Sequence, residues 1–415
     1  MRYTIEDLFD RSVEHSVARF DEEQVGAYKR EKGKTMKRST ERILTTHTGS
    51  LPRPDDLVQM MYDKEEGKLL DEAMFADRVR SAVTETVQHE VAADIDVISD
   101  GEMGKVSFVS YVKDRLTGFG GESTPFLPRD MLDHPDVMQR IFGAGTRRRM
   151  NTPACDGPVV VRDKDAVQRD INNFKAALQG VQPEEAFMCA ASPGVIAQVM
   201  ANTYYPSREA YLYALADAMQ HEYQAIVAAG FILQVDCPDL AMERHLHFAD
   251  ASLDEFRRHV QQNVEVLNYA LADIPAEQAR VHVCWGNYAG PHHRDVPLKE
   301  IIDLLLEIHV NALSIEAANP RHEHEWKVFE TVRLPEGKVL IPGVIDTVTN
   351  HIEHPELVAQ RIVRCAKLMG RENVIAGTDC GFGTFVGTSP VASSVAWAKL
   401  QILAEGARLA SQELW

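Results

Sequence analysis

His282 and Cys284 are separated by one residue in a short apolar run, and both side chains can bind metals. Alternate residues of a β-strand point to the same face, so on a strand the imidazole and the thiol would project into one space. Two later apolar runs end in a carboxylate and in a second thiol. One imidazole, two thiolates and one carboxylate form a ligand set typical of zinc, so we expect a Zn²⁺ site. The predicted ligands are His282, Cys284, Glu316 and Cys380.

Two thiolates make this zinc electron-rich, and the expected chemistry follows from that. Hydrolytic zinc sites usually combine histidine and carboxylate ligands with a water molecule. A zinc ion that is rich in thiolate ligands is better suited to binding a substrate thiol and holding it as a nucleophilic thiolate at neutral pH. The sequence therefore predicts transfer of an alkyl group to sulfur. Glu316 is the ligand expected to yield when the substrate thiol binds.

Short apolar runs recur along the chain, separated by segments of helical periodicity. Most of the runs are nearly continuous in apolar residues, as in parallel strands buried on both faces. Eight βα units predict an α/β fold, a (β/α)8 TIM barrel, with catalytic groups at the carboxyl ends of the strands. A doubly wound open sheet is the alternative. The expected strands are 43–47, 96–100, 186–190, 231–236, 281–284, 312–316, 339–344 and 373–377.

The barrel is expected to form one catalytic domain over residues 41–415. Residues 1–40 are rich in charge and predict an N-terminal helical extension. The gap between the second and third expected strands is too long for a plain loop inside a compact domain. Residues 103–185 are therefore expected to form a long insertion after strand 2.

Composition excludes several classes of function. The net charge of −18 leaves no basic surface for nucleic acid or for an anionic membrane. The N-terminus has no apolar signal segment, and no apolar run approaches the roughly 20 residues that span a bilayer. Six cysteines in 415 residues do not indicate a disulfide scaffold. A reducing compartment, the cytoplasm, is expected.

Polar residues follow most of the expected strands, where a barrel places its chemistry. Ser50, Glu102, Asp236 and Asp346 stand at four such strand ends. The cysteines away from the predicted zinc site, Cys155, Cys189 and Cys365, are expected to be small core residues. Histidines gather after the fourth, fifth and sixth strands, and most of them are expected to be exposed loop residues. These histidines are His245, His247, His292, His293, His322 and His324.

Motifs spread over the whole predicted barrel resemble the catalytic C-terminal barrel of cobalamin-independent methionine synthase, from about residue 41 to the C-terminus. The segments that carry the resemblance are 45–52 (TTHTGSLP), 234–236 (QVD), 282–284 (HVC), 313–316 (LSIE), 342–346 (PGVID) and 379–381 (DCG). The resemblance implies the same four zinc ligands as the residue types. It also implies homocysteine-binding positions at Ser50, Glu102 and Asp236. Carboxylates suit the ammonium of an amino acid, and a Gly-Ser turn suits its carboxylate.

Two departures separate this chain from that family. The family enzyme has a long N-terminal half, where this chain has about forty residues. The family also places a histidine two residues after the Asp of strand seven, as the proton donor to a folate leaving group. This chain has Val348 there, after Asp346, which argues against folate as the methyl donor. Asp346 stays a candidate catalytic residue, and His245 or His247 is the expected replacement donor.

The leading expectation is a zinc-dependent methyltransferase of the methionine synthase type. Its partners would be a small-molecule thiol similar to homocysteine and a methyl or alkyl donor, with a homo-oligomer left open. The chain is also similar to the short relatives of methionine synthase, among them zinc enzymes that open epoxides with coenzyme M. An alkyl or epoxide:thiol transferase is therefore one alternative. A metal-free decarboxylase of the uroporphyrinogen type and a structural zinc protein are two others.

Overall fold

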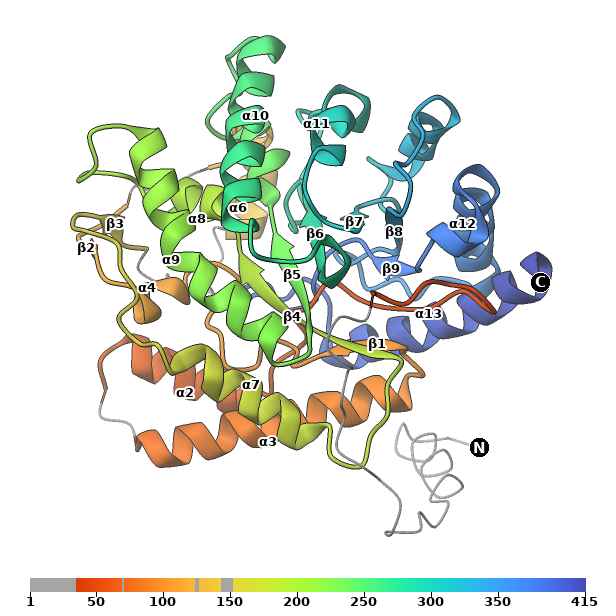
Figure 1. Ribbon diagram of the computed structural model, residues 1–415, viewed down its shortest axis with the longest axis horizontal. Coiled ribbons are helices and arrows are strands. Elements are labelled where there is room, and N and C mark those ends of the chain that lie inside the picture. Colours follow the sequence, from red (N-terminus) through yellow and green to blue (C-terminus); the bar gives the residue numbers. More distant parts are fainter. Residues whose placement is uncertain (1–34, 69–70, 124–126, 143–151) are drawn as a thin grey trace.

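A computed structural model describes residues 35–68, 71–123, 127–142 and 152–415. Seven strands form one curled sheet in the order β1-β4-β5-β6-β7-β8-β9, and every neighbouring pair is parallel. Figure 1 shows the strands in the middle of the molecule with helices around them. The strands are β1 (Val97–Ser99), β4 (Glu185–Ala191), β5 (Ile232–Asp236), β6 (Ala279–Val283), β7 (Ala312–Ile315), β8 (Val339–Ile345) and β9 (Gly377–Thr378).

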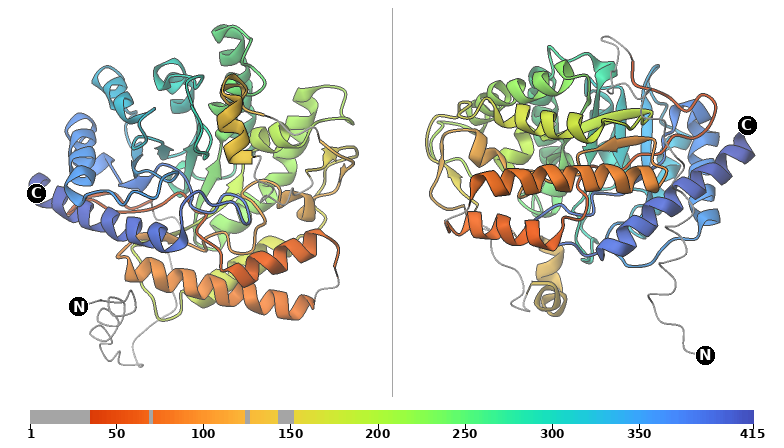
Figure 2. Two further views of the ribbon diagram at one scale, coloured as in Figure 1. Left: turned by 180° about the vertical axis from the view of Figure 1, so that it is seen from behind. Right: turned by 90° about the horizontal axis from the view of Figure 1, so that it is seen from below.

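Long helices cover the outside of this sheet. The side chains of Asp71, Ser192, Ser207 and Ser252 accept backbone N–H bonds at the starts of α3, α8, α9 and α10, so local sequence fixes where these helices begin. Helix α3 packs between α2 and α7 (Figure 2, right). The helices are α2 (Asp55–Glu65), α3 (Glu72–Ala92), α7 (Ala166–Ala177), α8 (Pro193–Val199), α9 (Arg208–Ala228), α10 (Leu253–Ala270), α11 (Ile302–Leu306), α12 (Pro355–Met369) and α13 (Ser393–Leu414).

Six short 3-10 helices stand in the connections between these elements. Most of them lie in segments that carry the chain away from a strand end or back toward the next strand. They are η1 (Pro238–Leu240), η2 (Met242–His245), η3 (Ala276–Gln278), η4 (Leu298–Glu300), η5 (Glu323–Glu330) and η6 (Arg371–Asn373). None of the helices in the described residues combines the length and apolar character needed to cross a membrane.

Residues 44–46 connect the two edges of the sheet. Thr45 bridges Ala376, next to β9, and Thr46 bridges Val97 in β1, both in the parallel sense. The backbone bonds from Thr46 N to Ala376 O (2.9 Å) and from Val97 N to Thr45 O (3.0 Å) make these contacts. The first expected strand, 43–47, is thus present as a short bridging segment, and it links strand ends that are far apart in sequence.

The segment between β1 and β4 contains small elements of its own. Strands β2 (Phe119–Gly120) and β3 (Ala154–Cys155) pair in the antiparallel sense, apart from the main sheet. Helices α4 (Val112–Arg115), α5 (Arg129–Asp133) and α6 (Pro135–Phe142) lie in the same segment, and α7 follows. The insertion expected at 103–185 therefore has defined secondary structure. Most of the extension expected at 1–40 lies outside the described residues.

The predicted and observed elements differ mainly in their lengths. The α/β class and the parallel sheet are confirmed, and the expected strands that became β1 and β4 to β8 agree within a few residues. The eighth expected strand, 373–377, is reduced to β9 and two bridges, at Val374 and Ala376. The segment of helical periodicity between the fifth and sixth expected strands forms two short elements, η4 and α11. The sequence reading did not predict α13, which packs on α12.

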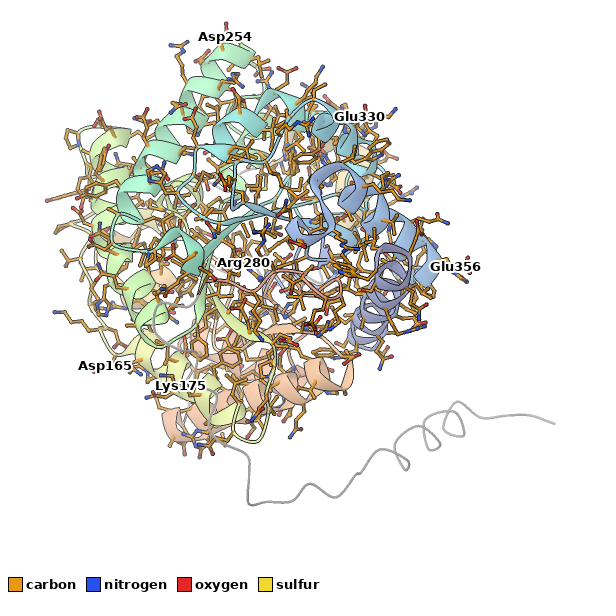
Figure 3. All side chains as sticks on the ribbon, turned by 45° about the vertical axis from the view of Figure 1, so that its right-hand side comes forward. Asp165, Lys175, Asp254, Arg280, Glu330 and Glu356 are labelled. Carbon is orange, nitrogen blue, oxygen red and sulfur yellow. The ribbon has the colours of Figure 1, made fainter. Side chains whose placement is uncertain are left out.

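Two apolar clusters hold the sheet. The larger one lies between the strands and the helices, and a smaller one combines residues from β1, β4, β5, β7 and β8. From β6, by contrast, the fully buried Arg280 donates to Gln234 Oε1 (2.8 Å), Thr46 Oγ1 (3.1 Å) and His47 O (3.1 Å), over the ring of Phe187. Figure 3 shows Arg280 within the molecule, while Asp254, Glu330 and Glu356 are peripheral. Arg280 thereby ties the 44–46 segment to β5 and β6.

Replacing Arg280 with Met should destabilise the protein more than an exposed arginine change does. The variant leaves the carbonyl of His47 and the side chain of Gln234 without their donor in a buried space. We expect a loss of about 3 kcal/mol in the free energy of unfolding, measured by urea titration. The control Arg258→Met, on the exposed face of α10, should stay within about 0.5 kcal/mol of the parent. Equal stabilities for the two variants would contradict this role for Arg280.

Candidate metal and substrate site

The imidazole of His282 and the thiols of Cys284 and Cys380 meet at the carboxyl ends of β6 and β9. Their ligand atoms all lie within 4.8 Å of one another, and the two Sγ atoms are 3.6 Å apart. All three side chains are buried. The structure thus brings together three of the four predicted zinc ligands, which come from the ends of two strands that are not neighbours in the sheet. Such a donor set, imidazole with two thiols, is one that Zn²⁺ prefers.

His282 offers the clearest test of whether this site fits a metal ion. Its Nδ1 lies 3.2 Å from the hydroxyl of Ser314, while its Nε2 is buried and has no hydrogen-bond partner among the described residues. Burial, with the charge of Arg280 adding, lowers the pKa of His282 to about 3, so the ring is neutral. A buried ring nitrogen without a partner is rare and requires an explanation. A metal ion bound between His282 and the two thiols supplies one, so the residues fit Zn²⁺.

Glu316, the fourth predicted ligand, lies beside this group and not within it. Its Oε1 accepts the backbone N–H of Trp285 (2.7 Å), and its Oε2 accepts the side-chain amide of Asn319 (2.8 Å). Burial, together with the nearby thiol of Cys284, raises the pKa of Glu316 well above its usual range. The carboxylate is therefore adjacent to the thiols but is held by the protein's own donors.

Asp379 fixes the turn that carries Glu316 and Asn319. Its carboxylate accepts the backbone N–H groups of Ala317, Ala318 and Asn319, each at 2.8 Å. Asp379 directly precedes Cys380 in the chain. One buried carboxylate therefore sets the position of the β7 turn relative to the second thiol, and burial raises its pKa to about 6.

A second buried group lies one strand away from the first. Ligand atoms of Glu102, Cys189 and Asp236 lie within 4.8 Å of one another, and Oε2 of Glu102 has no hydrogen-bond partner among the described residues. Burial, with the charge of Glu102 adding, raises the pKa of Asp236 well above its usual range. In the register of the sheet, Asp236 pairs with His282. Two buried carboxyl groups so arranged suit a small cation such as an ammonium.

Ser50 lies between the two groups. A Cβ on Gly381 would come within 2.0 Å of the Ser50 hydroxyl, so the residue after Cys380 must be glycine for Ser50 to stay. A Cβ on Gly49 would come within 2.3 Å of the Cys189 sulfur, and Gly49 has a φ of +131°. The predicted Gly-Ser turn therefore contacts the sulfur of Cys189 in the second group. It also contacts Gly381, which follows Cys380 of the first group.

A cleft of about 320 Å³ opens beside Glu316 and Cys380. Its walls come from the loop 286–292 and from the turns after β7 and β8. Asp346 lines the cleft, but its carboxylate accepts the N–H groups of Val348 (3.1 Å) and Thr349 (3.0 Å) and the Thr349 hydroxyl. Asp346 therefore holds its own turn, and the side chain of Val348 adds no proton donor to the cleft.

The two histidines predicted as replacement donors lie elsewhere. The side chain of His247 is 48% exposed and contacts Glu243 at 3.4 Å, away from the lining of the cleft. His245 is fully buried, with Nδ1 2.9 Å from Asp295 Oδ1, and it does not line the cleft either. The structure therefore brings neither side chain into the cleft that Glu316, Asp346 and Cys380 line.

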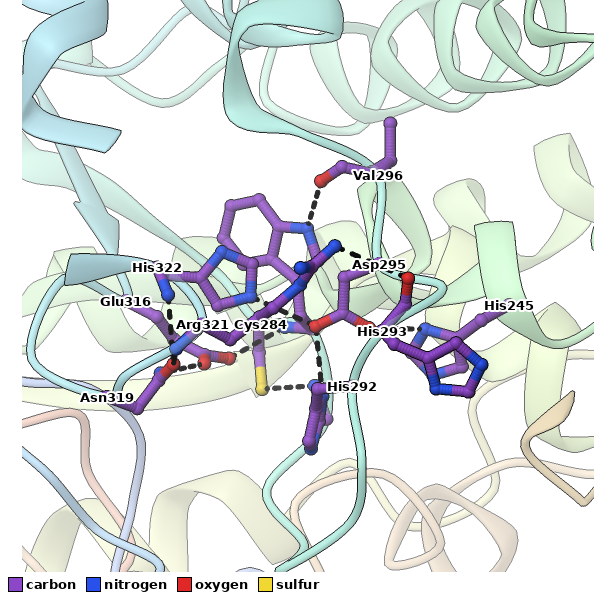
Figure 4. Close-up of polar contacts among 12 residues, drawn as sticks. His245, Cys284, His292, His293, Asp295, Val296, Glu316, Asn319, Arg321 and His322 are labelled. Carbon is purple, nitrogen blue, oxygen red and sulfur yellow. Dashed lines mark hydrogen bonds and ion pairs between the residues drawn. The ribbon is translucent and has the colours of Figure 1, made fainter. Parts of the chain in front are cut away.

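The carboxylate of Asp295 contacts the rings of three histidines. Besides His245, its carboxylate faces His292 Nδ1 and His322 Nε2, each at 3.0 Å (Figure 4). Burial alone would raise the pKa of Asp295, but the hydrogen bonds from these rings hold it below its usual range. Burial alone would lower the pKa of His322, but its bonds to Asp295 and Glu325 raise it to about 10. His322 is therefore a buried cation, which corrects the expectation of an exposed loop histidine.

The sequence alone did not indicate that Cys189, His292 and Asp295 lie at the site, and the reason differs for each. Cys189 is a buried core cysteine, as expected, and its position near the end of β4 also places its thiol with Glu102 and Asp236. Its place on a strand that leads to a polar strand end was the available signal. His292 is half-buried in the cleft wall, and nothing in its own segment indicates that. Asp295 has one partner in its own loop, His292, and two in other segments, His245 and His322, which only the fold brings to it.

The sequence of residues 157–398, more than half of the chain, matches the family described as cobalamin-independent synthase, catalytic domain. The methionine synthase of Saccharolobus islandicus is 24% identical over 373 residues, which cover 89% of this chain and 95% of that protein. The methionine synthase of Sulfurisphaera tokodaii is 25% identical over 372 residues, which cover 89% of this chain and 93% of that protein.

Two solved structures share the fold. A B12-independent methionine synthase from Shewanella sp. W3-18-1, in complex with selenomethionine, has a TM-score of 0.69 at 21% identity, over 90% of this chain and 99% of that chain. A putative vitamin-B12-independent methionine synthase from Listeria monocytogenes has a TM-score of 0.61 at 16% identity, over 90% and 99%. At these identities the likeness is one of fold alone.

Asp295→Asn should destabilise the protein in a pH-dependent way. The raised pKa of His322 contributes stability that is fully present below pH 6.5 and is lost as the pH rises through about 10. The depressed pKa of Asp295 contributes stability that is lost as the pH falls below about 4. We therefore expect a loss of about 3 kcal/mol near pH 6 that shrinks toward pH 10, measured by urea unfolding.

The control for this prediction is Asp133→Asn, which removes an exposed carboxylate paired with Arg294 and His293. It should leave the free energy of unfolding almost unchanged, because exposed ion pairs contribute little. A loss for Asp295→Asn that stays constant from pH 6 to pH 10 would show that the variant disturbs packing and not the ion pairs.

Proposed function

The chain belongs to the cobalamin-independent synthase catalytic-domain family and is a methyltransferase, and from this we propose that it methylates the sulfur of a homocysteine-like thiol at a zinc site. The observation that carries the proposal is the buried Nε2 of His282, which has no hydrogen-bond partner in the described part of the chain and lies beside two thiols. The proposed ligands are His282, Cys284, Cys380 and, from the neighbouring position, Glu316.

The second buried group supports an amino-acid thiol as the acceptor. Glu102 and Asp236 offer two carboxyl groups, one with an oxygen that has no partner among the described residues, for the ammonium. Ser50 and its turn lie between these carboxyl groups and Cys380, where the carboxylate of the amino acid would be bound. The pairing of Asp236 with His282 in adjacent strands sets the ammonium site one strand from the metal ligands.

Each residue then has a part in the reaction. When bound, zinc lowers the pKa of the substrate thiol and keeps its sulfur nucleophilic at neutral pH. Glu102 and Asp236 orient the amino acid so that its sulfur points toward the metal ligands. Glu316 is the ligand that yields to the substrate sulfur, because Trp285 N and Asn319 Nδ2 already hold its carboxylate. Asp379 keeps that turn in place throughout.

We also propose a more detailed assignment of the fold. Residues 44–46 complete the curled sheet as the first strand of a (β/α)8 barrel over residues 41–415. Residues 103–185 are its insertion, which adds α5 beside the cleft. The alternative, an alkyl or epoxide:thiol transferase that acts on coenzyme M, fits the second buried group less well. Coenzyme M carries a sulfonate where homocysteine carries its amino-acid group, and buried carboxylates would repel that anion.

Cys380→Ser should abolish both zinc binding and methyl transfer while keeping the fold. Loss of an outer-shell partner of a metal ligand already costs about 10- to 100-fold in affinity, so we expect at least about a 100-fold loss for this ligand. Zinc content by mass spectrometry, methylation of homocysteine and circular dichroism are the measurements. Cys365→Ser, a buried cysteine on α12, should keep one zinc ion per chain. An active zinc-free protein would contradict the proposal and favour the metal-free decarboxylase.

Asp236→Asn should raise the KM for homocysteine and spare thiols without an ammonium. Loss of a charge-assisted hydrogen bond costs about 1.5–3 kcal/mol, which corresponds to a KM that is about 10- to 100-fold higher. Methylation of 2-mercaptoethanol by the same variant should be nearly unchanged, since that thiol has no ammonium to bind. Equal losses with both thiols would contradict the assignment of Asp236 to the ammonium.

A further inference from the structure

His47 is a buried histidine to which the proposed reaction gives no part. It directly follows the bridging segment 44–46, and its ring lies between an outer helix and the turn that carries Ser50. Nε2 is 2.6 Å from Oε1 of Glu90, near the end of α3. Nδ1 is 3.1 Å from the backbone nitrogen of Gly49. The ring therefore connects the outside of the fold to the Gly-Ser turn.

These two contacts define which ring nitrogen of His47 carries the proton. The backbone nitrogen of Gly49 can only donate, so Nδ1 accepts and carries no proton. Burial, with the charge of Arg280 adding, lowers the pKa of His47 to about 3, so the ring is neutral and has one N–H. That proton is on Nε2 and is donated to Glu90. The geometry thus selects a single tautomer.

Glu90 supports this tautomer from α3. It is fully buried, and its Oε1 also accepts the backbone N–H of Ser99 (2.9 Å) at the end of β1. Burial raises the pKa of Glu90 well above its usual range. In its neutral form the carboxyl group carries its proton on Oε2, and Oε1 remains an acceptor for both N–H groups. Glu90 therefore holds His47 and the end of β1 with one oxygen.

Gly49 is held at both of its peptide groups. Its N–H donates to His47, and its carbonyl accepts the hydroxyl of Ser99 (3.3 Å). The same hydroxyl oxygen accepts the N–H of Gly101 (3.0 Å), one residue before Glu102. Glu90 thus connects, through His47 and Ser99, to both of the turns that meet at the second buried group.

The position of Gly49 decides how much room that group leaves for a ligand. A Cβ on Gly49 would come within 2.3 Å of the Cys189 sulfur and 3.0 Å of Glu102 Oε1, so its Cα faces both side chains. A small shift of this turn would change the space that an ammonium would occupy beside Glu102. It would also move Ser50, the next residue in the chain.

We propose that His47 is a positioning residue for the acceptor thiol, because it accepts the Gly49 N–H and so holds the Gly49–Ser50 turn in the shape that binds an amino acid. This inference rests on the proposed function, which assigns that turn to the amino-acid end of the substrate. The role belongs to Nδ1. Glu90 acts through the ring, since it holds the proton on Nε2 and leaves Nδ1 free to accept.

The first test reads the tautomer of His47 in the parent protein. In the zinc-loaded protein with ¹⁵N-labelled histidine at pH 7.5, NMR should show His47 with a proton on Nε2 and none on Nδ1. The signals are assigned by their absence in His47→Asn. A proton on Nδ1 at this pH would overturn the inference, because Gly49 would then have no acceptor.

The second test divides the two ring contacts of His47 between two variants. The side-chain oxygen of asparagine can take the place of Nδ1, and the side-chain nitrogen of glutamine can take the place of Nε2. His47→Asn therefore keeps the acceptor for Gly49, whereas His47→Gln keeps only the donor to Glu90. The dissociation constant of L-homocysteine is measured by calorimetry on the zinc-loaded protein. We expect it to rise about 10-fold in His47→Gln and less than about 3-fold in His47→Asn.

A second thiol separates positioning from general damage to the fold. 2-Mercaptoethanol has no amino-acid end, so its dissociation constant should be nearly unchanged in both variants. The matched control is His259→Asn, which removes the contact of another buried ring with a carboxylate, that of Glu243 on η2. This control should bind both thiols as the parent does. Equal weakening of both thiols in His47→Gln, or a larger loss for homocysteine in His47→Asn than in His47→Gln, would overturn the inference.

Circular dichroism checks the fold of each variant. If His47→Gln does not fold, the tautomer in the parent and the affinity of His47→Asn for homocysteine decide the question. Failure of the proposed function has a different signature, since the parent would then bind L-homocysteine no more tightly than 2-mercaptoethanol. A parent that prefers homocysteine, with the same preference in His47→Gln, would overturn the positioning role alone.

Discussion

The parallel register between β5, β6 and β7 is the constraint on which the site depends. Asp236, His282 and Ser314 are direct partners across these three strands, so their side chains must meet at one end of the sheet. Burying such groups is costly unless each has a partner. Backbone N–H groups partner the carboxyl groups of Glu316 and Asp379. Among the buried atoms of the described residues that lack a hydrogen-bond partner, His282 Nε2 and Glu102 Oε2 belong to the two groups that would hold a metal ion and a substrate.

Electrostatics divides the site into two halves. Around Glu102, Asp236, Glu316 and Asp379 the side chains are buried carboxyl groups, and burial raises the pKa of Asp236, Glu316 and Asp379 toward the neutral form. Around Asp295 the arrangement is reversed, because three imidazole rings converge on a single carboxylate. The two halves are separated by little more than the loop that follows β6.

The sequence patterns predicted the strands of the sheet more accurately than the segments that connect them. Continuous apolar runs predicted β4 to β8, because a parallel strand that is buried on both faces consists almost entirely of apolar residues. Helix α13 was missed, since its buried face contains Gly406, Ala407 and the buried Lys399, which weaken the apolar period. The candidate zinc ligands were recognisable because each stands at a strand end. His322 was not, because its burial depends on Trp285 and Asp295, which reach it only in the folded chain.

Asp130 connects the insertion to the loop that forms one wall of the cleft. The strand ends that carry Asp236, His282 and Cys380 belong to the main sheet, whereas the loop 286–292 is held by α5, which lies outside it. Changes in α5 can therefore reshape this wall of the cleft without disturbing the strands beneath. Relatives would be expected to diverge first in this helix and loop, while the strand ends stay as they are.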